Sequence, residues 1–118
     1  MKSFKSLILN AALFFVSNEA RIEKGIAPLA YQPNLEIMAW NHSVEMGKED
    51  FFDHINKKDK KRKTPEQRAA LAGIVNPNIS ENISAVGGVY FGSYLELADH
   101  VVDKWVKSPS HAKTLYSE

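Results

Sequence analysis

The stretch from Ser93 to His111, SYLELADHVVDKWVKSPSH, carries the clearest structural signals in the chain. Ser93 and Glu96 have the spacing of a capping box, which marks the start of a helix. Apolar residues then recur at helical spacing, and they are Leu97, Ala98, Val101, Val102 and Trp105. Pro109 ends this helix, because the residue before a proline is disfavoured in the α conformation. Ser108 becomes the candidate N-cap of a following helix. We therefore predict two consecutive helices, the first with its apolar face toward the core.

Similar signals occur earlier in the chain. A first helix should run to about Lys24 and stop at Gly25. A second should start near Pro33, place an apolar stripe between residues 35 and 46, and fray at 47–50. Thr64, with Pro65 and Gln67 behind it, predicts a third helix that ends at Gly73. Residues 79–86 alternate weakly and are the best strand candidate.

Composition narrows the class of protein. A chain of 118 residues with 44% hydrophobic and 25% charged residues is typical of one soluble globular domain. Its net charge of +1 gives no reason to expect nucleic-acid binding. The absence of cysteine excludes disulfides, thiolate zinc sites and a cysteine nucleophile.

One stretch is strongly basic. Residues 57–63, KKDKKRK, hold six basic residues and one acid, so they carry +5 and the remainder −4. A solvated loop is the ordinary interpretation of such a run. The alternative is a docking patch for an anionic surface, such as lipid headgroups or a cell-wall polymer.

The N-terminal segment has two interpretations. Basic residues at 2 and 5, the apolar run 7–16 and Ala20 resemble a signal peptide, and the run is too short to span a membrane. Alternatively the segment is an amphipathic helix. Its apolar face would then comprise Ile8, Ala11, Ala12, Phe15 and Ile22.

Four histidines and one acid are the candidates for chemistry. His42 falls on the apolar stripe of the second helix and is predicted to be a packed core residue, whereas His100 is predicted to be exposed. His54 and His111 lie at element boundaries, where side chains converge on clefts. Glu81 is an acid inside the strand candidate and would need a partner if buried. From the residues alone, a cluster of these two histidines with Glu81 is one hypothesis among several.

Seven short motifs, taken in order, resemble the CAP superfamily. This family, also called SCP-like domains, comprises cysteine-rich secretory proteins, antigen 5 and pathogenesis-related class 1 proteins. The resemblance is to its bacterial, cysteine-free branch and extends from about residue 11 to the end. The motifs are NEAR at 18–21, PLAY at 28–31, the spaced residues of 35–46, FFDH at 51–54, TP…R…AG at 64–73, SENI at 80–83 and WVKSPSH at 105–111.

The resemblance implies an α+β fold, an α-β-α sandwich around a small antiparallel sheet. It implies a cleft in which His54, Glu81 and His111 hold a divalent metal such as Zn²⁺, since zinc accepts histidine and carboxylate ligands. It implies no catalytic residues, and it places the protein outside the cytoplasm. It also assigns the run 7–16 to the first half of helix one, because cleavage after Ala20 would cut that helix.

Two departures from the family pattern shape these expectations. No acid follows Trp105, so the prediction is either a metal site with three protein ligands completed by water or a site that binds metal weakly. The single domain, residues 1–118, is expected to be truncated at its C-terminus, which would leave the sheet thin and the domain rich in helix. The function expected is non-enzymatic binding. The alternatives are a metal-assisted hydrolase with Glu81 as base, or a protein-interaction domain without a working site.

Overall fold

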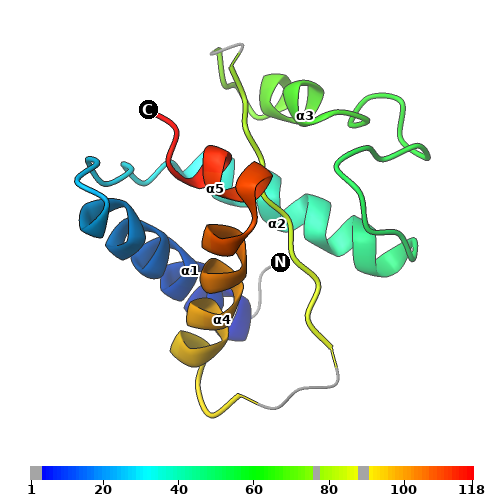
Figure 1. The fold of residues 1–118 in the computed structure, drawn as a ribbon. Coiled ribbons are helices and arrows are strands. Elements are labelled where there is room, and N and C mark those ends of the chain that lie inside the picture. The colour runs from blue at the N-terminus through cyan, green and yellow to red at the C-terminus, as the bar shows by residue number, and fades with distance from the viewer. Residues whose placement is uncertain (1–3, 76–77, 88–90) are drawn as a thin grey trace. The chain divides into compact units, whose positions relative to one another are not determined.

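The computed structural model describes residues 4–75, 78–87 and 91–118, and its regular structure there is helical (Figure 1). The elements are α1 (Phe4–Glu23), α2 (Pro33–Lys48), α3 (Pro65–Leu71), α4 (Tyr94–Lys107) and α5 (Pro109–Leu115). No strand occurs among the described residues. The expected α-β-α sandwich is therefore wrong for this structure.

The predicted strand at residues 79–86 is the part of the expected sandwich that the structure contradicts directly. This segment is irregular and forms no ladder with another described segment. A strand exists only when a partner satisfies its backbone N–H and C=O groups. The sequence offers one weakly alternating segment, and Glu81 within it is held by side-chain contacts with residues of the loop and of α3 instead.

The chain divides into two compact units. One comprises residues 1–31 and 86–118, with α1, α4 and α5, and the other comprises residues 32–85, with α2 and α3.

The core of the first unit lies between α1, α4 and α5. Its buried members are Val16, Ala98, Val102 and Leu115. The predicted apolar stripe of α4 is confirmed, because Ala98, Val101 and Val102 are buried and Trp105 packs against the core. Burying one such valine contributes about 1.5 kcal/mol or more.

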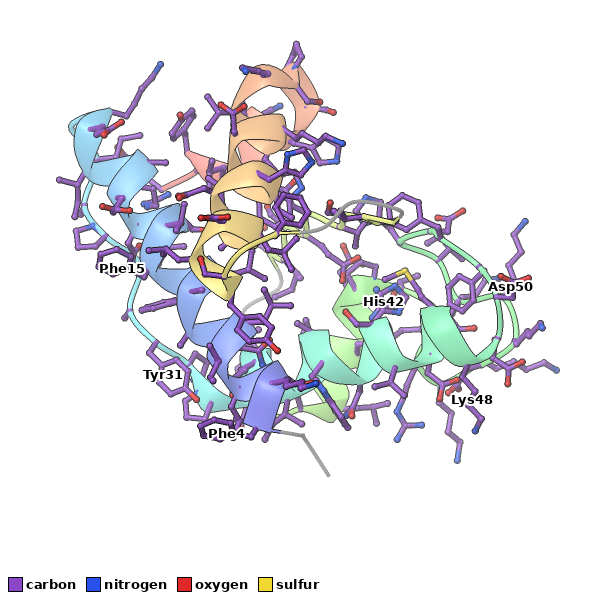
Figure 2. All side chains as sticks on the ribbon, turned by 90° about the horizontal axis from the view of Figure 1, so that it is seen from below. Phe4, Phe15, Tyr31, His42, Lys48 and Asp50 are labelled. Carbon is purple, nitrogen blue, oxygen red and sulfur yellow. The ribbon has the colours of Figure 1, made fainter. Side chains whose placement is uncertain are left out.

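The apolar face predicted for α1 is confirmed at Ala12 but is wrong at Phe15 and Ile22. Phe15 and Ile22 are 56% and 59% exposed, whereas Ala12, Leu13, Val16 and Ala20 pack on the core. Figure 2 shows Phe15 on the side of α1 that faces away from α4. The helix carries apolar residues around most of its circumference, so its helical periodicity is compatible with two different buried faces.

Predicted helix boundaries are confirmed at several ends. At the end of α1, Gly25 has φ +80°, the amide of Ile26 donates to the carbonyl of Arg21, and the amide of Gly25 donates to Ile22. These bonds form a Schellman motif. Thr64 and Gln67 form the reciprocal capping box of α3. Residue 2 of the N-terminal basic pair lies outside the described residues.

The helix starts at Ser93 and Ser108 differ in detail from the prediction. The Ser93 side chain accepts from the amide of Glu96, but the Glu96 carboxylate accepts from the amide of Gly92 rather than from that of Ser93. Ser108 occupies the N-cap position of α5 but makes no capping hydrogen bond with its side chain. Its hydroxyl contacts the ring of His111 instead.

In the second unit α2 starts and ends near the predicted residues. Gln32 caps it, with its side chain accepting from the amide of Asn34. His42 is 3% exposed, as predicted for a core histidine. Of the rest of the stripe, Met38 and Met46 are half-buried, whereas Leu35 and Ala39 remain exposed. Figure 2 shows Asp50 just beyond the end of α2.

Asp50→Gly is expected to raise the free energy of unfolding by about 0.5–1 kcal/mol. Asp50 has φ +54°, and the amide of Phe51 donates to the carbonyl of Met46, so Asp50 occupies the left-handed position after a helix. Gly73, with φ +83° after α3, is the matched control, and Gly73→Ala should destabilise by about 1 kcal/mol or more. Urea denaturation measures both changes. A loss of stability in Asp50→Gly would contradict this assignment.

Candidate functional site

Two of the predicted site residues meet in the second unit. Nδ1 of His54 lies 2.8 Å from Oε1 of Glu81. His54 follows α2 in a loop, and Glu81 lies in the irregular segment after α3. The side chain of Glu81 is 12% exposed and that of His54 is 44% exposed. A largely buried carboxylate therefore orients an imidazole ring that remains open to solvent.

Arg68 of α3 holds this pair in place. Its Nη2 donates to the carbonyl of His54 at 2.8 Å and to Oε2 of Glu81 at 3.1 Å. Its Nη1 donates to the carbonyls of Arg62 and Lys63 at 3.0 and 3.1 Å. One buried guanidinium thus ties together the backbone at residues 54 and 62–63 and the side chain of Glu81. A planar, always charged group with five N–H donors suits this role.

Arg68 was not predicted as a site residue. Sequence reasoning included it only as one member of a family motif. The available signal was the burial problem of Glu81, since a carboxylate in an apolar segment needs a cation or several donors. Pattern alone did not select Arg68 from among the basic residues that precede it.

His42 supports the same loop from α2. Its Nε2 lies 2.9 Å from the carbonyl oxygen of Asp53, the residue before His54. Since a carbonyl only accepts, Nε2 carries the proton in this contact. The ring also packs edge-on against Phe51, with ring centroids 5.8 Å apart. The backbone on the N-terminal side of His54 is therefore anchored to α2.

His111 lies in the first unit, at the start of α5. Its Nδ1 is 2.8 Å from the hydroxyl oxygen of Ser108, and the ring is half-buried. No group of three or more metal-binding side chains gathers within the part of the chain that the structure describes. The structure does not place the two units relative to one another. The three-residue set of His54, Glu81 and His111 therefore stays a prediction.

His100 was predicted to be exposed and is half-buried. Its ring lies 5.1 Å from that of Phe91, measured between centroids. This aromatic contact covers part of the ring that the helical pattern assigned to solvent.

The basic loop, residues 57–63, is organised by its one acid. Oδ1 of Asp59 accepts from the amides of Lys61 and Arg62 at 3.0 and 3.2 Å, and Oδ2 pairs with Arg62 at 3.5 Å. Desolvation acts to raise the pKa of Asp59, but these two backbone hydrogen bonds and the charge of Arg62 outweigh it and lower the pKa. The Asp59 contacts therefore stabilise the loop above the ordinary pKa of aspartate and are lost as pH falls through the lowered value.

Most lysines of the basic loop remain available. Lys58 pairs with Glu49 at 3.2 Å. The other four, Lys57, Lys60, Lys61 and Lys63, are exposed and form no ion pair with any described residue.

The sequence model of the cysteine-rich secretory protein family, CAP, matches residues 15–118. The chain belongs to this family. The absence of cysteine agrees with the cysteine-free branch that the motifs indicated. No curated protein and no solved structure gave a match.

The range that matches the CAP family contains the predicted site residues. It includes His54, Glu81 and His111, and it also includes Arg68 and His42. None of the helices described for this CAP-family chain is both long and apolar enough to cross a membrane.

Proposed function

We propose that this CAP-family chain is a non-enzymatic binding domain that acts outside the cytoplasm and holds a divalent metal, such as Zn²⁺, or a small ligand at His54. The observation that carries the proposal is the orientation of His54 by Glu81, which is itself held by Arg68. The location is proposed from the family, whose description is secretory.

The geometry of His54 suits a metal ligand. In metal sites a ligating histidine commonly donates its second ring N–H to a carboxylate, which fixes the tautomer and raises the basicity of the other nitrogen. Nδ1 of His54 contacts the Glu81 carboxylate, and Nε2 makes no hydrogen bond with any described residue. Nε2 is thus the nitrogen that would hold the metal. His111 is the proposed second ligand, and a bound metal would supply Lewis acidity and open coordination positions.

The contacts of Glu81 favour an orienting role over a catalytic one. Oε1 contacts His54 and Arg68, and Oε2 contacts Arg68. A general base must reach the proton it abstracts, directly or through one water. A carboxylate with both oxygens engaged by a cation and an imidazole is better placed to hold His54 than to activate water. We therefore propose that Glu81 orients His54, and its predicted role as a metal ligand stays a prediction.

Zinc titration followed by thermal denaturation tests the proposal. At ten times the dissociation constant, zinc should stabilise the folded chain by about 1.4 kcal/mol. For a chain of this size that raises Tm by roughly 3–8 °C. His54→Gln and His111→Gln should each remove most of the shift. His100→Gln is the matched control and should keep it, because His100 is outside the predicted ligand set.

Three results would overturn the metal proposal. Zinc would produce no shift in Tm, or the shift would persist in His54→Gln, or His100→Gln would abolish it as completely as His54→Gln does. Glu81→Gln gives a further check, because a role in orientation predicts weaker but measurable zinc binding in that variant. Losing a carboxylate that orients a ligating histidine typically lowers metal affinity by about 10–100-fold.

The basic loop suggests a surface for the same domain, and we propose that it contacts anionic phospholipid headgroups. Lys57, Lys60, Lys61 and Lys63 are exposed without ion pairs to described residues, and Asp59 holds the backbone between them in a turn. Each lysine near an anionic bilayer contributes about 1 kcal/mol. Four of them give measurable attraction without any apolar insertion.

Vesicle co-sedimentation tests this surface. The chain should sediment with vesicles that contain phosphatidylserine and remain in solution with pure phosphatidylcholine. Replacing the four exposed loop lysines with glutamine should abolish most of the binding, at about 1 kcal/mol per lysine. The matched control replaces four exposed lysines elsewhere, Lys5, Lys48, Lys104 and Lys113, with the same change in net charge. Equal losses in both variants, or binding retained in the loop variant, would contradict the proposal.

A further inference from the structure

A groove of about 700 Å³ lies in the first unit, between α1 and α4 and beside the end of α5. Its apolar part includes Val16 and Ala20 of α1 and Val102 and Val106 of α4. Val16 and Val102 belong to the core, so the base of the groove is fixed by packing. Figure 1 shows α1 and α4 next to one another within this unit.

Acidic side chains from both helices line the same groove. Glu19 and Glu23 come from α1, and Asp99 and Asp103 come from α4. Asp103 pairs with Lys107 at 2.8 Å, whereas the other three form no ion pair with any described residue. All four are exposed. The groove therefore combines an apolar base with carboxylates supplied from two sides.

This arrangement is unfavourable in the free chain. In each helix the two acids are four residues apart, and like charges at that spacing destabilise a helix by about 0.2–0.5 kcal/mol. Glu23 is also the last residue of α1, where the helix dipole disfavours a negative charge. A cationic partner in the groove would relieve both effects.

Lys24 shows how a cation can be held at one end of the groove. Its Nζ lies 5.1 Å from the centroid of the Tyr116 ring, and both residues line the groove. This distance is within the range of cation–π attraction. Lys24 is the one lysine or arginine among the described lining residues, so it competes with any incoming cation for the ring.

We propose that this groove docks a peptide segment of a partner protein in which basic and apolar side chains alternate. The apolar side chains would lie against Ala20 and Val106, the less buried apolar residues of the groove, and the basic ones would reach Glu19, Glu23 and Asp99. Charge complementarity of this kind sets specificity and association rate. A purely basic segment, such as the loop at 57–63, fits less well because it offers nothing to the apolar base.

Fluorescence anisotropy with labelled synthetic peptides tests the proposal on the full chain. The probe alternates lysine with leucine. Two comparison peptides alternate lysine with serine and glutamate with leucine. The chain should bind the lysine–leucine peptide most tightly, the lysine–serine peptide more weakly, and the glutamate–leucine peptide not at all. Binding of the first should weaken as salt is added, because exposed charges are screened.

Two kinds of groove variant should change the Kd for the lysine–leucine peptide in opposite directions. Glu19→Gln with Asp99→Asn should raise the Kd about five- to tenfold, at about 0.5–0.7 kcal/mol per exposed pair. Lys24→Gln should lower the Kd about two- to fivefold, because it frees the Tyr116 ring. Glu66→Gln with Glu118→Gln is the matched control. It removes the same charge from exposed positions outside the groove and should leave the Kd unchanged.

Several outcomes would overturn the proposal. The control pair would weaken binding as much as the groove pair, or Lys24→Gln would fail to tighten it, or the lysine–serine peptide would bind as well as the lysine–leucine peptide. Self-association of the chain that depends on Glu19 and Asp99, measured by light scattering, would identify a second copy as the occupant instead.

Discussion

Replacing Arg68 with methionine is expected to lower the free energy of unfolding by about 3–5 kcal/mol, the usual loss when one partner of a buried ion pair is removed. Arg68 is 5% exposed and donates to Glu81 and to the carbonyls of His54, Arg62 and Lys63. Its loss leaves the Glu81 carboxylate without a cation in a largely buried position. Urea denaturation measures the change.

Trp40 lies in the unit of residues 32–85 and Trp105 in the other, so a Trp105→Phe background reports on the unit that contains Arg68. Arg62→Met, which removes an exposed pair with Asp59, is the control and should change stability by less than about 1 kcal/mol. Arg68→Met with Glu81→Met should recover part of the loss. A decrease below about 1 kcal/mol in Arg68→Met would contradict the role assigned to this arginine.

Arg21→Met is expected to destabilise the first unit by about 2–4 kcal/mol, because each buried acceptor left without its donor costs about 1–3 kcal/mol. Nε of Arg21 donates to the carbonyl of Ala27 at 2.9 Å. Nη1 donates to the carbonyls of Leu115 and Ser117 at 2.9 and 2.7 Å. The side chain thus ties the end of α1 to the end of α5, where helix carbonyls lack intrahelical partners.

Fluorescence of Trp105 in a Trp40→Phe background follows this unit during urea denaturation. Arg21→Lys should recover little stability, since one ammonium group cannot reproduce the fork of a guanidinium. Lys113→Met, at an exposed position of α5, is the control and should be nearly neutral. Equal stability of Arg21→Lys and the unmodified chain would show that charge alone is needed, which contradicts the geometric role.

The helix boundaries could be predicted because their signals are local. Thr64, Gln67, Gly25 and Gly73 act on backbone groups within a few residues of themselves. Pro109 likewise acts on its immediate neighbours. Such contacts depend little on the rest of the fold, so they can be predicted from the local sequence.

The absence of a sheet among the described residues and the buried face of α1 could not be predicted, because both depend on contacts between segments that are distant in sequence. Whether residues 79–86 form a strand depends on a partner segment, and periodicity within one segment says nothing about pairing. For α1, helical spacing was compatible with two faces. The choice of Val16 over Phe15 followed from which side chains fit against α4.

The candidate site was predictable in part. The family motifs selected His54 and Glu81, and the structure brings these two together at 2.8 Å. Arg68 and the orienting role of Glu81 needed coordinates, because the guanidinium joins His54 and Glu81, which lie 14 and 13 positions from it along the chain. The pairing of His54 with His111 stays a prediction.

Nitrogen-15 NMR of the histidine side chains tests the central claim most directly. We expect His54 to carry its proton on Nδ1, toward Glu81, and zinc to shift the resonance of Nε2. Glu81→Gln should weaken the preference for this tautomer, while His100 should be unaffected by either change. A proton on Nε2 in the zinc-free chain, or zinc bound at Nδ1, would contradict the account.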